Sequence, residues 1–130
     1  MKEAGLAALT EMRNIRDTFR SKSSRLKKCS YGYYSKNVSK NEEALRELED
    51  LQSKFDKVGQ DWFDAAYDHE IDHPCFDTDE EDEFYEEESY QIKNEMSKTI
   101  KSISKKFDKF KARLDSDSKE SNPDHNQKNF

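Results

Sequence analysis

One stretch of the chain, residues 41–71, carries apolar side chains at alternating steps of four and three residues. This spacing places them along one narrow line of an α-helix, as in the a and d positions of a coiled coil. A helix cannot bury such a line against itself, so the spacing predicts packing against another helix, in this chain or in a second one. The positions on the line are Ala44, Leu48, Leu51, Phe55, Val58, Trp62 and Ala65.

A second apolar line with nearly the same period predicts a helix over residues 79–114. Thr78 is a suitable N-cap, and the acidic residues after it suit the positive end of a helix dipole. Pro74 disfavours helix at the residue before it, so a turn is expected between the two helices. Together the two segments predict a long antiparallel helical hairpin or coiled coil. The positions on the second line are Tyr85, Ile92, Met96, Ile100, Ile103, Phe107, Phe110 and Leu114.

Residues 2–29 predict an additional N-terminal helix, with an apolar stripe from Leu6 to Leu26 and a basic face. We expect a three-helix arrangement in which this helix packs on the hairpin or pairs with another copy. Two interpretations of the basic face are open. Its long side chains can remain in solvent while their stems cover part of the apolar stripe. Alternatively, they contact the phosphates of a nucleic acid or an anionic lipid, although no base-reading motif accompanies them. The basic residues are Arg13, Arg16, Arg20, Arg25, Lys27 and Lys28.

Residues 30–40 are expected to connect the first two helices, because Gly32 and several small polar residues lie there. Three tyrosines accompany them: Tyr31, Tyr33 and Tyr34. Such rings commonly close the end of a helix pair, with the ring buried and the hydroxyl in water. They could instead form a platform on which nucleic-acid bases stack. The first interpretation is favoured, and the second belongs with the nucleic-acid alternative.

The composition favours an all-α fold. Charged residues make up 40% of the chain, which by itself would suggest disorder, but the apolar residues recur at helical spacing. Three Gly and two Pro are too few for a fold rich in tight turns. The apolar pattern stops after Leu114. We therefore expect one helical domain over residues 1–114 and a disordered tail over residues 115–130.

The charge falls into three blocks. Residues 1–40 hold ten Lys/Arg and three Asp/Glu, residues 41–91 hold three and twenty, and residues 92–130 hold ten and six. This order suits a chain folded back on itself with opposite charges facing each other, or copies attracted head to tail. In a hairpin, the acidic start of the last helix would adjoin the acidic end of the one before it. We expect this acidic apex to repel itself, so that a basic partner or cations would relieve it.

A possible metal site is suggested by His69, His73 and Cys75, which are spaced as H-x3-H-x-C. A structural zinc site normally has four ligands, and only the distant Cys29 could complete the set. A polar loop without metal is favoured, and a metal-binding helical protein remains an alternative. Two cysteines in a chain of this size suit a reducing intracellular setting, the cytoplasm being favoured. No apolar run approaches the roughly 20 residues that span a membrane.

The sequence contains no catalytic signature. Gly occurs only at positions 5, 32 and 59, so no glycine loop could hold a phosphate. There is no G-x-S-x-G nucleophile elbow, and the carboxylates occur in runs typical of solvated surface. A bundle of long helices with a thin core also leaves little room for a substrate cavity. We expect a non-enzyme without a cofactor.

The segment LRELEDL at residues 45–51, continuing through Phe55, Val58 and Trp62, precedes an acidic run at residues 79–88 that contains Phe84 and Tyr85. Over residues 10–110 this pattern resembles the helical gag-like N-terminal region of Pao/BEL-type retrotransposon polyproteins. The chain lacks the zinc knuckle and the protease motif of such polyproteins. The resemblance implies a scaffold or self-assembly role and supplies no catalytic residue. We therefore predict a structural protein that acts by coiled-coil assembly, through its apolar lines, with another protein or with a second copy of itself.

Overall fold

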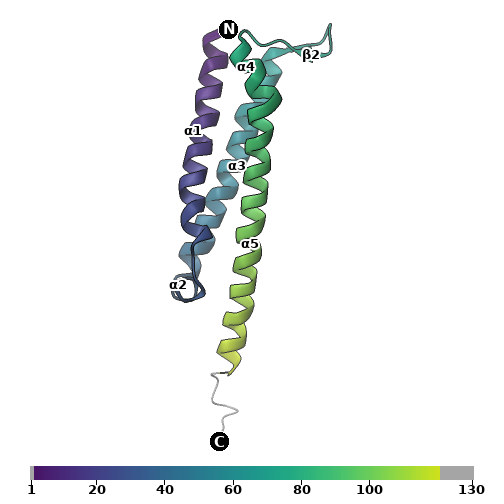
Figure 1. Ribbon diagram of the computed structural model, residues 1–130. Helices are drawn as coiled ribbons and strands as arrows, with labels where there is room; N and C mark the ends of the chain where they lie inside the picture. The colour runs from purple at the N-terminus through teal and green to yellow at the C-terminus, as the bar shows by residue number, and fades with distance from the viewer. Residues whose placement is uncertain (1, 121–130) are drawn as a thin grey trace, which may run out of the picture.

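The computed structural model describes residues 2–120, and side chains within residues 4–117. Three long helices lie side by side, the first and last running in one direction and the middle one in the other (Figure 1). The elements are α1 (Lys2–Lys27), α2 (Tyr31–Lys36), α3 (Val38–Ala66), β1 (Tyr67–Asp68), β2 (His73–Pro74), α4 (Asp79–Glu83), the π-helical segment η1 (Phe84–Glu88) and α5 (Ser89–Glu120). The all-α prediction is confirmed.

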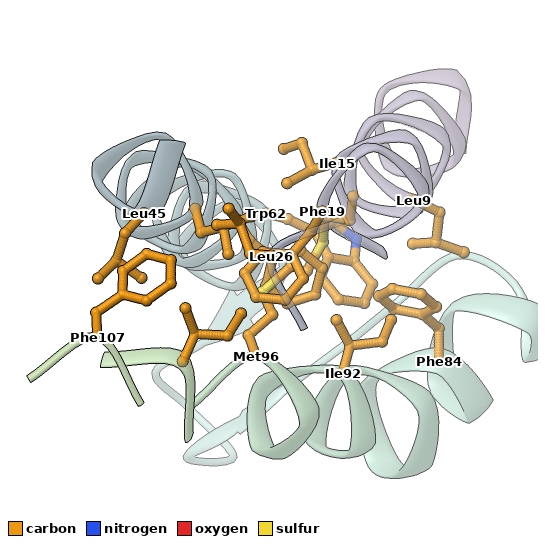
Figure 2. Packing of buried hydrophobic residues seen from close by; sticks show 14 of the residues in the cluster. Leu9, Ile15, Phe19, Leu26, Leu45, Trp62, Phe84, Ile92, Met96 and Phe107 are labelled. Carbon is orange, nitrogen blue, oxygen red and sulfur yellow. The ribbon is translucent and has the colours of Figure 1, made fainter. Parts of the chain in front are cut away.

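The core lies between the three long helices, and each of them contributes to it. The α1–α3 contact is the most extensive, and α5 packs against both helices. Figure 2 shows side chains of all three helices meeting in the space between them. The first helix therefore packs against both of the others, which confirms the predicted three-helix arrangement. Its buried apolar residues are Leu9, Met12, Ile15, Phe19 and Leu26.

The two predicted apolar lines are buried between helices of the same chain. The fully buried members are Leu48, Phe55, Trp62, Ile92, Met96, Ile103 and Phe107. The half-buried members are Leu51, Val58, Ile100, Phe110 and Leu114. Ala65 is exposed, whereas Leu45, which lies off the predicted line, is buried. A helix that faces two neighbours buries a wider strip than the narrow seam of a helix pair, so α3 uses Leu45 as well.

The last of the long helical stretches is interrupted by a π-helical segment. Thr78 caps its start as predicted, its Oγ1 accepting a hydrogen bond from the Glu81 amide at 3.2 Å. In η1 the Ser89 amide donates to the Phe84 carbonyl, five residues back, which inserts one extra residue into the helix. In a regular helix, Tyr85 would lie two turns before Ile92 and on the same buried side. The extra residue places Phe84 at that buried position instead. Phe84 is 1% exposed, and Tyr85 is half-buried.

The α3 helix ends at Ala66, so the prediction of helix up to residue 71 is wrong for its last five residues. The backbone turns extended at Tyr67, and β1 pairs antiparallel with β2 across a turn in which Asp72 has a φ of 54°. This reversal brings Phe76 onto Trp62, with ring centroids 4.4 Å apart. The spacing of apolar residues contains no signal for that long-range contact. The helix predicted from this spacing is therefore too long.

Two further boundaries differ from the prediction. The connection between α1 and α3 contains a short helix, α2, in which Ser30 Oγ accepts from the Tyr33 amide at 3.2 Å. The α3 helix begins at Val38, before the predicted start at residue 41, so Asn41 lies within it and is buried. The α5 helix continues to Glu120 and extends beyond α2 (Figure 1), so the expected disorder is wrong for residues 115–120. The rest of the expected tail, residues 121–130, lies outside the described residues.

Candidate interaction surface at the acidic end

One end of the bundle is strongly acidic. Residues 58–92 hold fourteen Asp/Glu and not one Lys or Arg. They include the end of α3, the β1–β2 hairpin, α4, η1 and the start of α5, which gather where α1 begins (Figure 1). We call this region the acidic end. Carboxylates at such density repel one another and destabilise the fold unless positively charged side chains lie close to them.

Arginines of α1 neutralise one side of the acidic end. Arg13 Nη1 lies 2.9 Å from Glu80 Oε2, and its Nε lies 3.2 Å from Glu88 Oε2. Arg16 Nη1 contacts the same Glu88 oxygen at 2.9 Å. The hydrogen bonds with Glu88 and Glu80 raise the pKa of Arg13. The basic partner that the acidic apex was expected to need is thus supplied in part by the chain's own first helix.

The same pairing continues along α1. Arg20 Nη2 lies 2.7 Å from Glu95 Oε1, and this hydrogen bond lowers the pKa of the Glu95 carboxyl group. Three of the six residues proposed for nucleic-acid contact, Arg13, Arg16 and Arg20, therefore hold carboxylates of their own chain. Among the described residues no ion pair joins α3 to α5. Opposite charges do face each other within the folded chain, through pairs that α1 makes with α4, η1 and α5.

A buried carboxylate lies at the centre of this end. Glu81 is 2% exposed; Trp62 Nε1 donates to its Oε2 at 2.9 Å, and Thr78 Oγ1 donates to its Oε1 at 3.2 Å. A Cβ added to Gly5 would lie within 2.1 Å of the same Oε2, so the carboxylate rests directly on the backbone of α1. The prediction that the carboxylates of this run are solvated is wrong for Glu81. The signal it missed is the spacing of Thr78 and Glu81, which matches a capping box.

Aromatic rings pack around Trp62, the side chain that donates to this carboxylate. Trp62 stacks on Phe76 and meets Phe84 edge to face, with centroids 5.7 Å apart. Phe63 stacks on Tyr85 at 5.7 Å. The indole therefore has its faces in an aromatic cluster and its N–H on a carboxylate, which satisfies both its apolar and its polar parts. The Trp62 side chain is consequently fixed in place.

A groove of about 530 Å³ runs beside Trp62, between α1 and α3. Small and apolar side chains form its floor: Ala4, Ala7, Ala8, Val58, Ala65, Ala66, Trp62 and Phe76. Carboxylates accompany them: Glu11, Asp61, Asp77 and the buried Glu81. No Lys or Arg side chain lines the groove within residues 4–117, although Asp61 Oδ2 lies 3.3 Å from Lys57 Nζ outside it. Two large apolar side chains of the acidic end are exposed as well, Ile71 at 58% and Tyr90 at 52%.

The candidate metal ligands are not brought together. The His69 ring packs edge-on against Tyr67 at 4.6 Å, and His73 Nδ1 lies 2.6 Å from the Pro74 carbonyl oxygen. Cys75 Sγ lies 4.0 Å from Asp68 Oδ2. Across residues 4–117, no three His, Cys, Asp or Glu side chains are grouped so that they could hold a metal ion.

The other three residues proposed for nucleic-acid contact lie at the opposite end of the bundle. They are Arg25, Lys27 and Lys28, and all three are exposed. Lys106 Nζ donates to the Leu26 and Lys27 carbonyl oxygens, at 2.7 and 2.8 Å, and so caps the end of α1. The Leu26 carbonyl also accepts from the Cys29 amide at 3.2 Å, so Lys106 adds a second donor to a turn that already closes the helix.

The tyrosines of the connection close this opposite end. Tyr34 is fully buried, packs on Phe107 with centroids 4.9 Å apart, and donates from its hydroxyl to Glu42 Oε2 at 2.6 Å. Tyr31 packs on Phe110 at 5.6 Å. The prediction that these rings close the end of the helices is confirmed for both tyrosines, but the Tyr34 hydroxyl is buried on Glu42 and does not lie in water as expected. Tyr33 remains 49% exposed.

No family model, no curated protein and no solved structure matches this chain. The resemblance to gag-like regions therefore stays a prediction. None of the helices, over the part of the chain that the structure describes, is long and apolar enough to cross a membrane.

Proposed function

We propose that this protein is a non-enzymatic helical scaffold whose acidic end binds a basic amphipathic helix of a partner protein. The observation that carries the proposal is the groove beside Trp62, which combines an apolar floor with surrounding carboxylates and, within residues 4–117, contains no cation. An amphipathic helix buries its apolar face in such a groove, and lysines or arginines flanking that face would meet the carboxylates.

The burial of the two apolar lines supports placing the contact on the outer surface. Leu48, Phe55 and Ile103 are at most 1% exposed within a single chain. A contact that used them would require the bundle to open and lose its core. The groove floor and the exposed Ile71 and Tyr90 need no such opening. Exposed apolar area bordered by charge is typical of protein interaction sites.

Trp62 provides a built-in reporter for this proposal, because it is the only tryptophan of the chain and lines the groove. The test is to titrate the protein with a synthetic helix that has Leu and Ala on one face and Lys beside it. We expect a saturable change in Trp62 emission. A peptide in which Glu replaces every Lys is the matched control and should leave the emission unchanged. Equal binding of the two peptides, or of neither, would contradict the proposal.

Two pairs of charge variants locate the contact on the protein. Glu11→Gln with Asp61→Asn removes two carboxylates of the groove, and we expect about tenfold weaker binding of the basic peptide, roughly 1.4 kcal/mol. Glu49→Gln with Asp50→Asn removes two exposed carboxylates of α3 outside the groove and serves as the control. Equal losses in both pairs would indicate attraction by net charge alone.

The α5 helix of a second copy also carries basic side chains, so the partner could be the chain itself. Light scattering of the protein alone, across a range of salt concentrations, tests this case. A mass that rises at low salt would identify a second copy as the occupant. A mass equal to one chain throughout would assign the groove to a different protein.

A further inference from the structure

A second hollow lies at the opposite end of the bundle from the acidic groove. It has a volume of about 430 Å³ and lies between the end of α1 and the start of α3, with Ser30 and Tyr33 at one side. Its size falls in the range of small-molecule sites. Four cationic side chains line it, namely Lys22, Arg25, Lys28 and Lys40, and we call it the basic pocket.

The cations of the basic pocket are largely without partners. Lys22 lies 3.3 Å from Glu47, the only carboxylate among the described residues that line the pocket. The side chains of Arg25, Lys28 and Lys40 have no hydrogen bond or ion pair with any described residue. Arg13 and Arg16, which come earlier in the same helix, differ because they hold carboxylates of their own chain. Three unpaired cations around one hollow favour a ligand with more than one negative charge.

The inner wall of the basic pocket is neutral. Leu26 and Asn41 are buried, and the Asn41 carboxamide is already satisfied because it donates to the Asn37 carbonyl at 2.8 Å and accepts from the Cys29 thiol at 3.6 Å. Burial raises the pKa of the Cys29 thiol, so no thiolate offsets the cations. The half-exposed Tyr33 ring adds an aromatic surface at the side of the pocket.

We propose that the basic pocket binds a phosphate monoester that carries an aromatic or apolar group. A phosphate monoester has a charge of about −1.5 to −2 near neutral pH, which suits three unpaired cations. Arg25 supplies the planar donor pair that phosphate oxygens accept, and the lysines supply point charges around it. The organic group would lie against Leu26 and the Tyr33 ring. This proposal is independent of the groove at the acidic end.

The test is a titration of the full chain with phenyl phosphate, followed by the backbone amide resonances in NMR spectra. We expect shifts concentrated at residues 22–44 and saturating within the millimolar range. Inorganic phosphate should shift the same amides with at least severalfold weaker affinity, because it lacks the ring. Phenol, which lacks the phosphate, should not bind. Shifts spread over the whole surface, or equal affinity for phenyl phosphate and phenol, would overturn the proposal.

Two double variants separate this site from general attraction. Arg25→Gln with Lys40→Gln should weaken phenyl phosphate binding at least tenfold. Arg46→Gln with Lys101→Gln removes the same charge from exposed positions outside the pocket, and should leave the affinity unchanged. All four side chains are exposed, so circular dichroism should show every variant folded. Equal weakening in both pairs would overturn the proposal.

A short single-stranded oligonucleotide with its 5′ phosphate removed distinguishes the source of the phosphate. It contains phosphodiesters but no monoester, so we expect it to bind more weakly than phenyl phosphate. Tighter binding of this oligonucleotide, lost in the Arg25→Gln, Lys40→Gln pair, would overturn the monoester assignment. It would instead support nucleic-acid contact through the half of the basic face that remains unpaired.

Discussion

The two ends of the bundle are both closed by aromatic rings, yet they accommodate charge in different ways. At the acidic end, Trp62 donates to a buried carboxylate, Glu81, and arginines from a different helix hold the carboxylates around it. At the opposite end, Tyr34 fills the space and Lys106 caps the peptide carbonyls of α1. Carbonyl caps complete a helix without bringing like charges together, whereas the acidic end depends on pairs made across the bundle.

The largest expected effect concerns Trp62. Trp62→Ala should lower the free energy of unfolding by about 4 kcal/mol or more, because it leaves a cavity and removes the N–H donor of a buried carboxylate. Phe107→Ala at the opposite end leaves a cavity but no unpaired charge, so its loss should be smaller. Urea denaturation followed by circular dichroism measures both.

Trp62→Phe isolates the hydrogen bond to Glu81. This variant keeps an aromatic ring in the cluster and removes the N–H group, so we expect a loss of about 1–3 kcal/mol. A stability equal to that of the unmodified protein would show that Glu81 does not depend on the indole. The difference between the two ends would then lie in packing alone.

A second comparison uses two helical glycines. Alanine normally stabilises a helix by up to about 1 kcal/mol relative to glycine. At Gly5 the new Cβ would collide with the Glu81 carboxylate, which Trp62 and Thr78 hold in place, so Gly5→Ala should destabilise by about 1–3 kcal/mol. Thermal or urea denaturation reports the change.

Gly59→Ala is the matched control for Gly5→Ala. Its Cβ would lie 3.0 Å from Met12 Cε, the end of a flexible side chain that can shift. We expect Gly59→Ala to be neutral or stabilising. If both substitutions stabilised the protein, Glu81 would not be fixed against α1.

A third comparison removes two positive charges from α1, beside the acidic end in one variant and at the opposite end of the bundle in the other. Arg13→Gln with Arg16→Gln should cost about 1 kcal/mol at low salt, because Glu80 and Glu88 lose their partners within an acidic region. These arginine side chains are 33% and 21% exposed, which limits the effect. Added salt screens the repulsion between carboxylates and should reduce the loss.

Arg25→Gln with Lys27→Gln is the control, since neither side chain has an ion-pair partner among the described residues. We expect a change within about 0.5 kcal/mol. Urea denaturation at two salt concentrations measures the free energy of unfolding of both pairs. Equal losses would show that the acidic end does not depend on ion pairs more than the opposite end does.

The smallest expected effect is a dependence of stability on pH through Glu95. Its folded-state pKa is lowered by the hydrogen bond from Arg20, so the stabilisation is present above its unfolded value of 4.5 and is lost as pH falls below it. The Glu95 side chain is 36% exposed, so solvent reduces the contribution to a few tenths of a kcal/mol. Arg20→Gln should raise the pKa of Glu95 in an NMR titration and flatten this part of the pH profile. An unchanged pKa would show that the pair does not persist in solution.

Parts of the fold could be predicted because they depend on local pattern. The period of four and three placed Leu48, Phe55 and Ile103 in the core, and Thr78 was identified as a cap from its neighbours. The candidate site could not be predicted in this way. Glu81 is one of five consecutive acidic residues, and only the approach of Trp62 and Gly5, far away in the sequence, distinguishes it from the other four.

The sequence by itself determined that the chain is helical, where its long helices lie approximately, and which side of each helix is apolar. These properties follow from residue spacing, because helical geometry repeats the same relation along the chain. The tertiary structure alone decided which helices meet and which charges pair. Arg13 and Arg16 could bind an external anion as well as Glu88, and only the packing of α1 brings that carboxylate within 3.2 Å or less. Contacts between distant residues depend on the arrangement of the whole bundle, and no local repeat contains that information.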